Sequence, residues 1–184
     1  DVFAAKGTEP THHHRVTLFR HCKVKLRLGK ARSKNVAWPW GKKCNPWSGW
    51  LYPVRRSGHT SKNSEIVFLA PDDADRAEGV AGRIWSQAKP QSLHVPKGSF
   101  GNGDTWDEQT KRNYEKATHL PSGWLTQRGT DCHTLALSFW GIPIEVKGQR
   151  WGVLLIDSRS KNVDFSKINE KLILSMLDKL LQKV

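Results

Sequence analysis

Two apolar segments separated by a short turn place the strongest constraint on what this chain can fold into. The first segment runs over 134–146, the second over 150–157, and Lys147-Gly148-Gln149 lies between them. A glycine in so short a connection is typical of a β-hairpin, because the turn needs backbone angles that other residues avoid. The sequence therefore predicts two adjacent antiparallel strands here.

Other segments supply further strands and helices. Four more strands are expected where apolar residues alternate with basic ones or are bounded by turn residues, at 15–28, 49–56, 65–70 and 92–95. Three helices are expected, at 74–88, 107–118 and 164–184. Asp164 is the expected N-cap of the last one. This order of elements predicts an α+β fold with a mostly antiparallel sheet.

The hairpin and the first predicted helix resemble the corresponding parts of GAF domains. The hairpin has a serine, Ser138, before the pair Pro143-Ile144, then the turn glycine and a strand that reads Gly-Val-Leu-Leu-Ile over 152–156. An Asp164-Phe165 step and an amphipathic helix follow, as in the family. The small residues of the helix at 77–85 are also similar to the family pattern. The resemblance covers residues 15–184.

GAF domains are similar to PAS domains, so the resemblance implies a central antiparallel sheet with the terminal helix on one face and a lidded ligand pocket on the other. It implies one domain over 15–184, after a disordered or linker lead-in at 1–14. The lid would be the long polar region 97–130, which a compact domain rarely keeps without a use. The basic, Trp-rich segment 29–49 is longer than the usual hairpin turn of the family.

The resemblance also implies a function. Such a domain binds a small molecule and passes its ligand state to a fused or associated partner in signal transduction, and it is not an enzyme. The candidate ligand contacts are two residues of the lid and two of a predicted strand: Trp124, Arg128, Ser138 and Trp140. Arg128 would bind a carboxylate or phosphate. The resemblance does not identify the ligand. Nucleotides stay among the candidates, although the family's cyclic-nucleotide motif is not found. No cofactor is identified.

Cysteine and metal chemistry have weaker support. The GAF-like reduction of methionine sulfoxide needs several close thiols, and only Cys132 lies near the lid. Cys132-His133 matches a bilin-attachment dipeptide, but its neighbouring motif is missing, which favours a buried structural cysteine. One group of histidines with a cysteine has ligand types that suit zinc: His12, His13, His14, His21 and Cys22. Their spacing is not that of a zinc site, so we predict no metal. Three widely spaced cysteines indicate a reducing, cytoplasmic location.

The positive charge is concentrated in the first third of the chain. Residues 1–62 carry 14 Lys and Arg against two acids, a net charge of +12, out of +13 for the whole chain. The alternative function is therefore an anion-binding interaction module that docks through 15–62 on an acidic membrane or, less favoured, on nucleic acid. A solvated basic face explains the charge equally well. The candidate surface contacts are Lys23, Lys25, Arg27, Lys30, Arg32, Lys34, Lys42 and Lys43, with Trp38, Trp40 and Trp47 at the headgroup level.

Membrane association would place the protein at the inner face of a membrane. No apolar segment of the sequence is long enough to cross a bilayer. The long first helix of the family is missing from 1–14, so we expect the native protein to continue upstream, where a transmembrane segment could lie.

The last predicted helix has two adjacent apolar rows. One row is expected to face the sheet: Ile168, Leu172, Met176 and Leu180. The other is expected to face a second copy of the chain: Ile173, Leu177 and Leu181. Two rows are too wide for one narrow contact, so the sequence predicts a homodimer through this helix.

Overall fold

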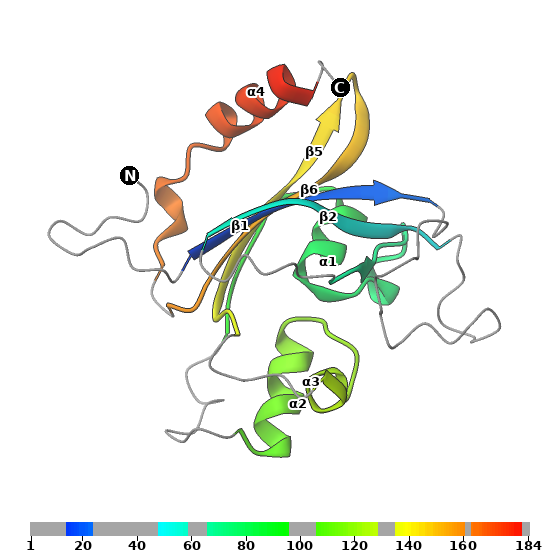
Figure 1. Cartoon of the computed structure of the whole chain (residues 1–184), viewed down its shortest axis with the longest axis vertical. Helices are drawn as coiled ribbons and strands as arrows, with labels where there is room; N and C mark the ends of the chain where they lie inside the picture. Colours follow the sequence, from blue (N-terminus) through cyan, green and yellow to red (C-terminus); the bar gives the residue numbers. More distant parts are fainter. Residues whose placement is uncertain are drawn as a thin grey trace, which may run out of the picture.

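A computed structural model of the chain describes residues 14–23, 48–58, 66–95, 106–128, 135–160 and 163–181. Its centre is a six-stranded sheet, curled and antiparallel at every pairing, with the strand order β3-β2-β1-β6-β5-β4 (Figure 1). The strands are β1 (His14–Cys22), β2 (Trp50–Gly58), β3 (Phe68–Leu69), β4 (Gln91–His94), β5 (Ser138–Val146) and β6 (Gln149–Ser158). The predicted α+β class is confirmed.

The predicted hairpin is β5 and β6, and a two-residue turn joins these strands. Val146 pairs with Gln149, and the two residues between them, Lys147 and Gly148, have φ values of 53° and 73°. Positive φ at both central positions matches the right-handed twist of the flanking strands. β6 then pairs with β1 on its other side, so the first and last strands form the middle of the sheet.

Helices cover both faces of the sheet. α1 (Gly79–Gln87), α2 (Glu108–Ala117) and α3 (Trp124–Arg128) lie on one side, and α4 (Glu170–Leu181) lies on the other (Figure 1). Alternate residues of β6 divide accordingly: Val153 and Leu155 join the core with α1, whereas Leu154 and Ile156 join the core beneath α4. β5 and the second half of β6 are therefore buried on both faces and mostly apolar.

The predicted helix 74–88 is interrupted. It consists of a 3-10 turn, η1 (Ala74–Arg76), and then α1. The Asp73 carboxylate accepts a hydrogen bond from the Asp75 amide at the start of η1, and Gly79 starts α1 with φ +67°. A Cβ at Gly79 would lie 2.7 Å from the Phe68 ring, so glycine permits both the backbone turn and the close approach to β3. The predicted helix at 107–118 is α2, capped by Asp107.

The terminal helix begins later than expected. Asp164 caps a 3-10 turn, η3 (Phe165–Lys167), and the Asn169 side chain accepts a hydrogen bond from the Leu172 amide at the start of α4. The sequence analysis assigned the two apolar rows of this helix to the wrong sides. Ile173 and Leu177 pack beneath the helix, together with Ile168 and Leu181. The exposed row is Leu172, Met176 and Leu180, at 56%, 56% and 62% exposed.

Both rows of α4 are apolar and have the same spacing, so the pattern does not tell them apart. The break between η3 and α4 sets the rotation of the helix, and Phe165, which is buried in the same core, fixes the start of this segment.

Several predicted segments fall partly or wholly outside the described residues. The predicted lead-in 1–14 is described only at His14, which begins β1, and the segment 29–49 only at Ser48 and Gly49. Just after it, Trp50 is buried together with Val67 and Leu69. Of the predicted lid, 106–128 is described and forms α2 and α3. Within the described ranges, no helix has both the length and the apolar character needed to cross a membrane.

Candidate ligand cavity

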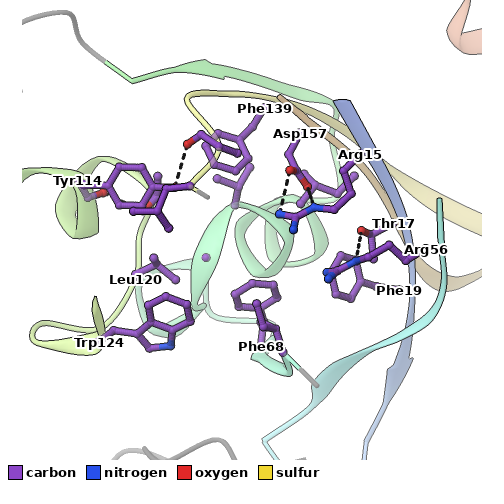
Figure 2. A pocket seen from close by; sticks show the side chains of 17 residues that line it. Arg15, Thr17, Phe19, Arg56, Phe68, Tyr114, Leu120, Trp124, Phe139 and Asp157 are labelled. Carbon is purple, nitrogen blue, oxygen red and sulfur yellow. Dashed lines mark hydrogen bonds and ion pairs between the residues drawn. The ribbon is translucent and has the colours of Figure 1, made fainter. Parts of the chain in front are cut away.

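A cavity of about 160 Å³ lies between the sheet and the helices on the α1 side (Figure 2). One wall is polar and comes from the three adjacent strands β2, β1 and β6. The opposite side is apolar, with side chains from β3, from α3 and from the segment between α2 and α3. Figure 2 shows the two walls facing one another across the cavity. A molecule bound here would therefore meet one polar and one apolar surface.

The polar wall begins with an ion pair between β1 and β6. Arg15 and Asp157 are opposite one another in the strand register. The guanidinium donates to both carboxylate oxygens at 2.9 Å, through Nε and one terminal nitrogen. Asp157 is only 4% exposed, and the Arg15 guanidinium stabilises its buried charge. The bidentate geometry fixes the orientation of both side chains.

Arg56 forms the second part of the polar wall. It pairs across the strands with Thr17, and its Nε donates to Thr17 Oγ1 at 3.1 Å. Its Nη1 is buried and has no hydrogen-bond partner among the described residues. Burial, aided by the nearby Arg15 and opposed by Asp157, lowers the pKa of Arg56 to about 10. The guanidinium is therefore still charged at neutral pH.

Aromatic rings line both sides of the cavity, with Phe19 on β1 beside Arg56 and the others on the apolar side. Phe19 and Phe68 lie with their ring centroids 5.7 Å apart, and Trp124 reaches the cavity from α3. Tyr114 of α2 also lines it, but the phenol donates to the Ala136 carbonyl at 2.9 Å. Thr118, another lining residue, donates its hydroxyl proton to the Tyr114 carbonyl at 2.7 Å. These two hydroxyls therefore stabilise the fold and have no proton left to donate to a ligand.

A buried carboxylate holds α3, and with it Trp124, in place. Glu115 is 3% exposed, and its two oxygens accept the backbone amides of Gly123 and Leu125, both at 2.8 Å. These amides lie at the start of α3, where a helix has no backbone partners for its first N–H groups. The negative charge also lies at the favourable end of the helix dipole. The described part of the predicted lid is thus held by Glu115 from α2.

Of the four predicted ligand contacts, the structure describes the side chains of Trp124, Ser138 and Trp140, and they do not lie together. Trp124 lines the cavity. Arg128 is the last residue of α3, but its side chain lies outside what the structure describes. Ser138 and Trp140 are on one face of β5, as the alternation predicted, but Trp140 packs in the core beneath α4. The prediction that they form a floor beneath the lid is therefore corrected.

Ser138 has a structural role in this arrangement. Its hydroxyl is fully buried and donates to the Ser160 carbonyl at 2.7 Å. The same oxygen lies 3.0 Å from His94 Nδ1, so this nitrogen must be the donor, because the hydroxyl has only one proton. His94 in turn stacks on Phe165, with ring centroids 5.7 Å apart. These contacts join β4, β5 and η3 on the face away from the cavity.

The sequence analysis did not select the residues of the polar wall: Arg15, Thr17, Arg56 and Asp157. The sequence did contain two indications of this wall. Asp157 is an acid at the end of the apolar run 150–157, and Arg15 lies two positions before Thr17, so it shares the same strand face. Only the pairing of β1 with both β2 and β6 brings these residues together.

Most of the predicted anionic-surface contacts lie outside the described residues. Lys23, just after β1, is exposed, and Lys25, Arg27, Lys30, Arg32, Lys34, Lys42 and Lys43 are not described. The anionic surface contact through these residues therefore stays a prediction.

Of the histidines and the cysteine that were considered as metal ligands, His21 stacks on Trp85 with ring centroids 3.8 Å apart, and Cys22 is a free, half-buried thiol. Burial lowers the pKa of His21, although the hydrogen bond to the Ala70 carbonyl opposes this shift. In the described ranges, no three side chains of the metal-ligating types come together.

The comparisons with known proteins give no relative from which a family could be assigned. No family model matches the chain, and no curated protein or solved structure matches it significantly.

Proposed function

We propose that this chain is a GAF-like sensory or regulatory domain that binds a small molecule in the cavity between the sheet and α2 and α3. The observation that carries the proposal is the cavity itself, with a polar wall of strand residues and an apolar wall in part from the predicted lid. The resemblance at the hairpin and first helix implies a pocket on this side and a terminal helix on the other. The positions of α2, α3 and α4 agree with that expectation.

Binding rather than catalysis fits the chemistry of the cavity. Among its described lining residues the charged groups are Arg15, Arg56 and Asp157, and two of them are engaged in an ion pair. A guanidinium stays protonated near neutral pH and is suited to holding an anion rather than transferring a proton.

The two faces of β6 offer a route from the cavity to α4. Leu155 and Asp157 line the cavity, and the intervening Ile156 packs in the core beneath α4. A ligand that moves the cavity face of β6 therefore also acts on the surface that supports α4. We propose that α4 passes this change to a second copy of the chain through its exposed apolar row, Leu172, Met176 and Leu180.

The cavity can be tested by filling it. Leu120, in the segment between α2 and α3, lines the apolar side, and a Leu120→Trp substitution should occupy much of the volume. We expect small molecules that raise the melting temperature of the wild type to have no such effect on this variant. Native mass spectrometry of the purified wild type would show a retained ligand at one per chain. Leu172→Trp, on the exposed face of α4, is the matched control and should keep the response. Equal responses in all three proteins would place the ligand elsewhere.

The homodimer can be tested through the exposed row of α4. A Leu172→Glu, Met176→Glu double variant should stay folded, because both side chains are more than half exposed, but sediment as a monomer. Lys171→Glu, an exposed position on the same helix, is the control for charge and should leave the dimer intact. Analytical ultracentrifugation over a range of concentrations gives the readout. A wild type that stays monomeric at hundreds of micromolar would contradict the dimer.

A further inference from the structure

Among the described residues that line the cavity, the polar wall carries two positive charges and one negative charge, those of Arg15, Arg56 and Asp157. Both carboxylate oxygens of Asp157 accept from the Arg15 guanidinium, so the charges of these two side chains largely cancel. Arg56 remains, and its described side-chain hydrogen bond goes to a neutral hydroxyl. This guanidinium is half-buried and its buried Nη1 has no hydrogen-bond partner among the described residues, which is costly, and an anion of single charge in the cavity would offset that cost.

The same wall has two unused donors, on the neighbouring side chains of Arg56 and Thr17. Arg56 Nη1 has no partner among the described residues. Thr17 Oγ1 accepts from Arg56 Nε, so its proton is free to go to another acceptor, and no described group takes it. Thr17 is fully buried, so the hydroxyl is held in place by packing. Two donors on neighbouring side chains, one of them charged, suit the two oxygens of a carboxylate.

The rest of the cavity suits an apolar ring. Phe68 and Trp124 lie on the side opposite Arg56 in Figure 2, and Leu120 lies near Trp124. The hydroxyls of Tyr114 and Thr118 donate to backbone carbonyls, so a sugar or a polyol would lose hydrogen bonds on entering. A volume of about 160 Å³ is close to that of an engineered apolar cavity of about 150 Å³ that binds benzene. The size therefore fits one ring with a small substituent.

We propose that the cavity binds a single-ring aromatic monocarboxylate, with the carboxylate on Arg56 and Thr17 and the ring against Phe68 and Trp124. This inference rests on the proposed ligand-binding function and names the chemical class of the ligand. A phosphomonoester is disfavoured because the described residues of the wall supply one surplus positive charge, which leaves the second phosphate charge without a partner.

Benzoate is the probe for the test, and benzamide is its neutral counterpart of nearly the same shape. Isothermal titration calorimetry should show benzoate binding to the wild type at one per chain, at least tenfold more tightly than benzamide. Inorganic phosphate should not compete. The assignment would be overturned if benzamide bound as tightly as benzoate, or if phosphate displaced benzoate. Both measurements use the wild-type protein, so they do not depend on the folding of a variant.

Variants of the wall provide the second arm. Arg56→Met should weaken benzoate binding by about tenfold to a hundredfold, because a charge-assisted hydrogen bond is lost. Arg55→Met is the matched control: Arg55 is the exposed neighbour on β2 and is not among the residues that line the cavity, so affinity should not change. Thr17→Val should cost less than Arg56→Met. A folded Arg56→Met protein with wild-type affinity would remove Arg56 from the site.

The Leu120→Trp variant separates this inference from the proposed function. If a neutral or differently charged molecule stabilises the wild type but not Leu120→Trp, the ligand class is wrong and the cavity is still a binding site. If benzoate binds the wild type and Leu120→Trp equally, the acid binds outside the cavity and the inference fails. If no small molecule binds in the cavity, both proposals fail.

Discussion

A Gly152→Ala variant should lose about 3 kcal/mol of unfolding free energy or more, an effect at the upper end of what one added methyl group causes. Gly152 lies in β6 opposite Arg20 of β1, in the middle of the sheet. A Cβ there would come within 2.0 Å of the Phe19 carbonyl oxygen and 3.0 Å of the Phe19 carbonyl carbon. Both atoms belong to the backbone of a central strand, so relief requires β1 and β6 to separate.

The matched control is Gly148→Ala in the β5–β6 turn. A Cβ at Gly148 meets no atom within 4 Å, but the residue has φ +73°. Its cost is therefore only the strain of a left-handed backbone, about 1 kcal/mol. Urea unfolding of the two variants beside the wild type measures the difference. If the two variants lost similar amounts of unfolding free energy, the close approach of β1 and β6 would not be the reason for glycine at position 152.

The parts of the fold that the sequence predicted well are those that local chemistry determines. The β5–β6 hairpin follows from two apolar runs and a glycine turn, and α2 follows from Asp107 as a cap and the residues after it. α3 was missed because it is only five residues long and its start is held by Glu115, eight to ten residues away in sequence, rather than by its own periodicity. Such a helix has no signal in its own sequence.

The candidate site was harder to predict, because β5 is buried on both faces. Ser138 and Trp140 do share one face, as period two requires, but alternation does not tell which layer covers that face. The polar wall instead comes from pairing across three strands, in which Arg15 meets Asp157 and Thr17 meets Arg56. The strand register is set by tertiary structure, and the sequence separations between these residues do not predict which of them pair.

An Asp157→Leu variant should lose about 3 kcal/mol of unfolding free energy, because it leaves the Arg15 guanidinium without a partner beside a second guanidinium, Arg56. We take the lower end of the range for a broken buried pair, since the Arg15 side chain is 20% exposed and water can reach it. Asp75→Leu is the control. Asp75 also forms an ion pair, with Arg83 at 3.5 Å, but its side chain is 95% exposed, and its loss should cost less than about 0.5 kcal/mol.

A double variant tests whether the cost of Asp157→Leu comes from the unpaired charge. Adding Arg15→Met to Asp157→Leu removes both charges and keeps side chains of similar length, so most of the lost stability should return. A double-mutant cycle by urea unfolding should then give a coupling of about 2 kcal/mol between the two positions. Additive losses, with the double variant less stable than either single one, would mean that packing at β1 and β6 rather than the ion pair stabilises this wall. Recovery of stability in the double variant would instead show that the ion pair can be replaced as a unit, because the cost arises when one charge is left alone.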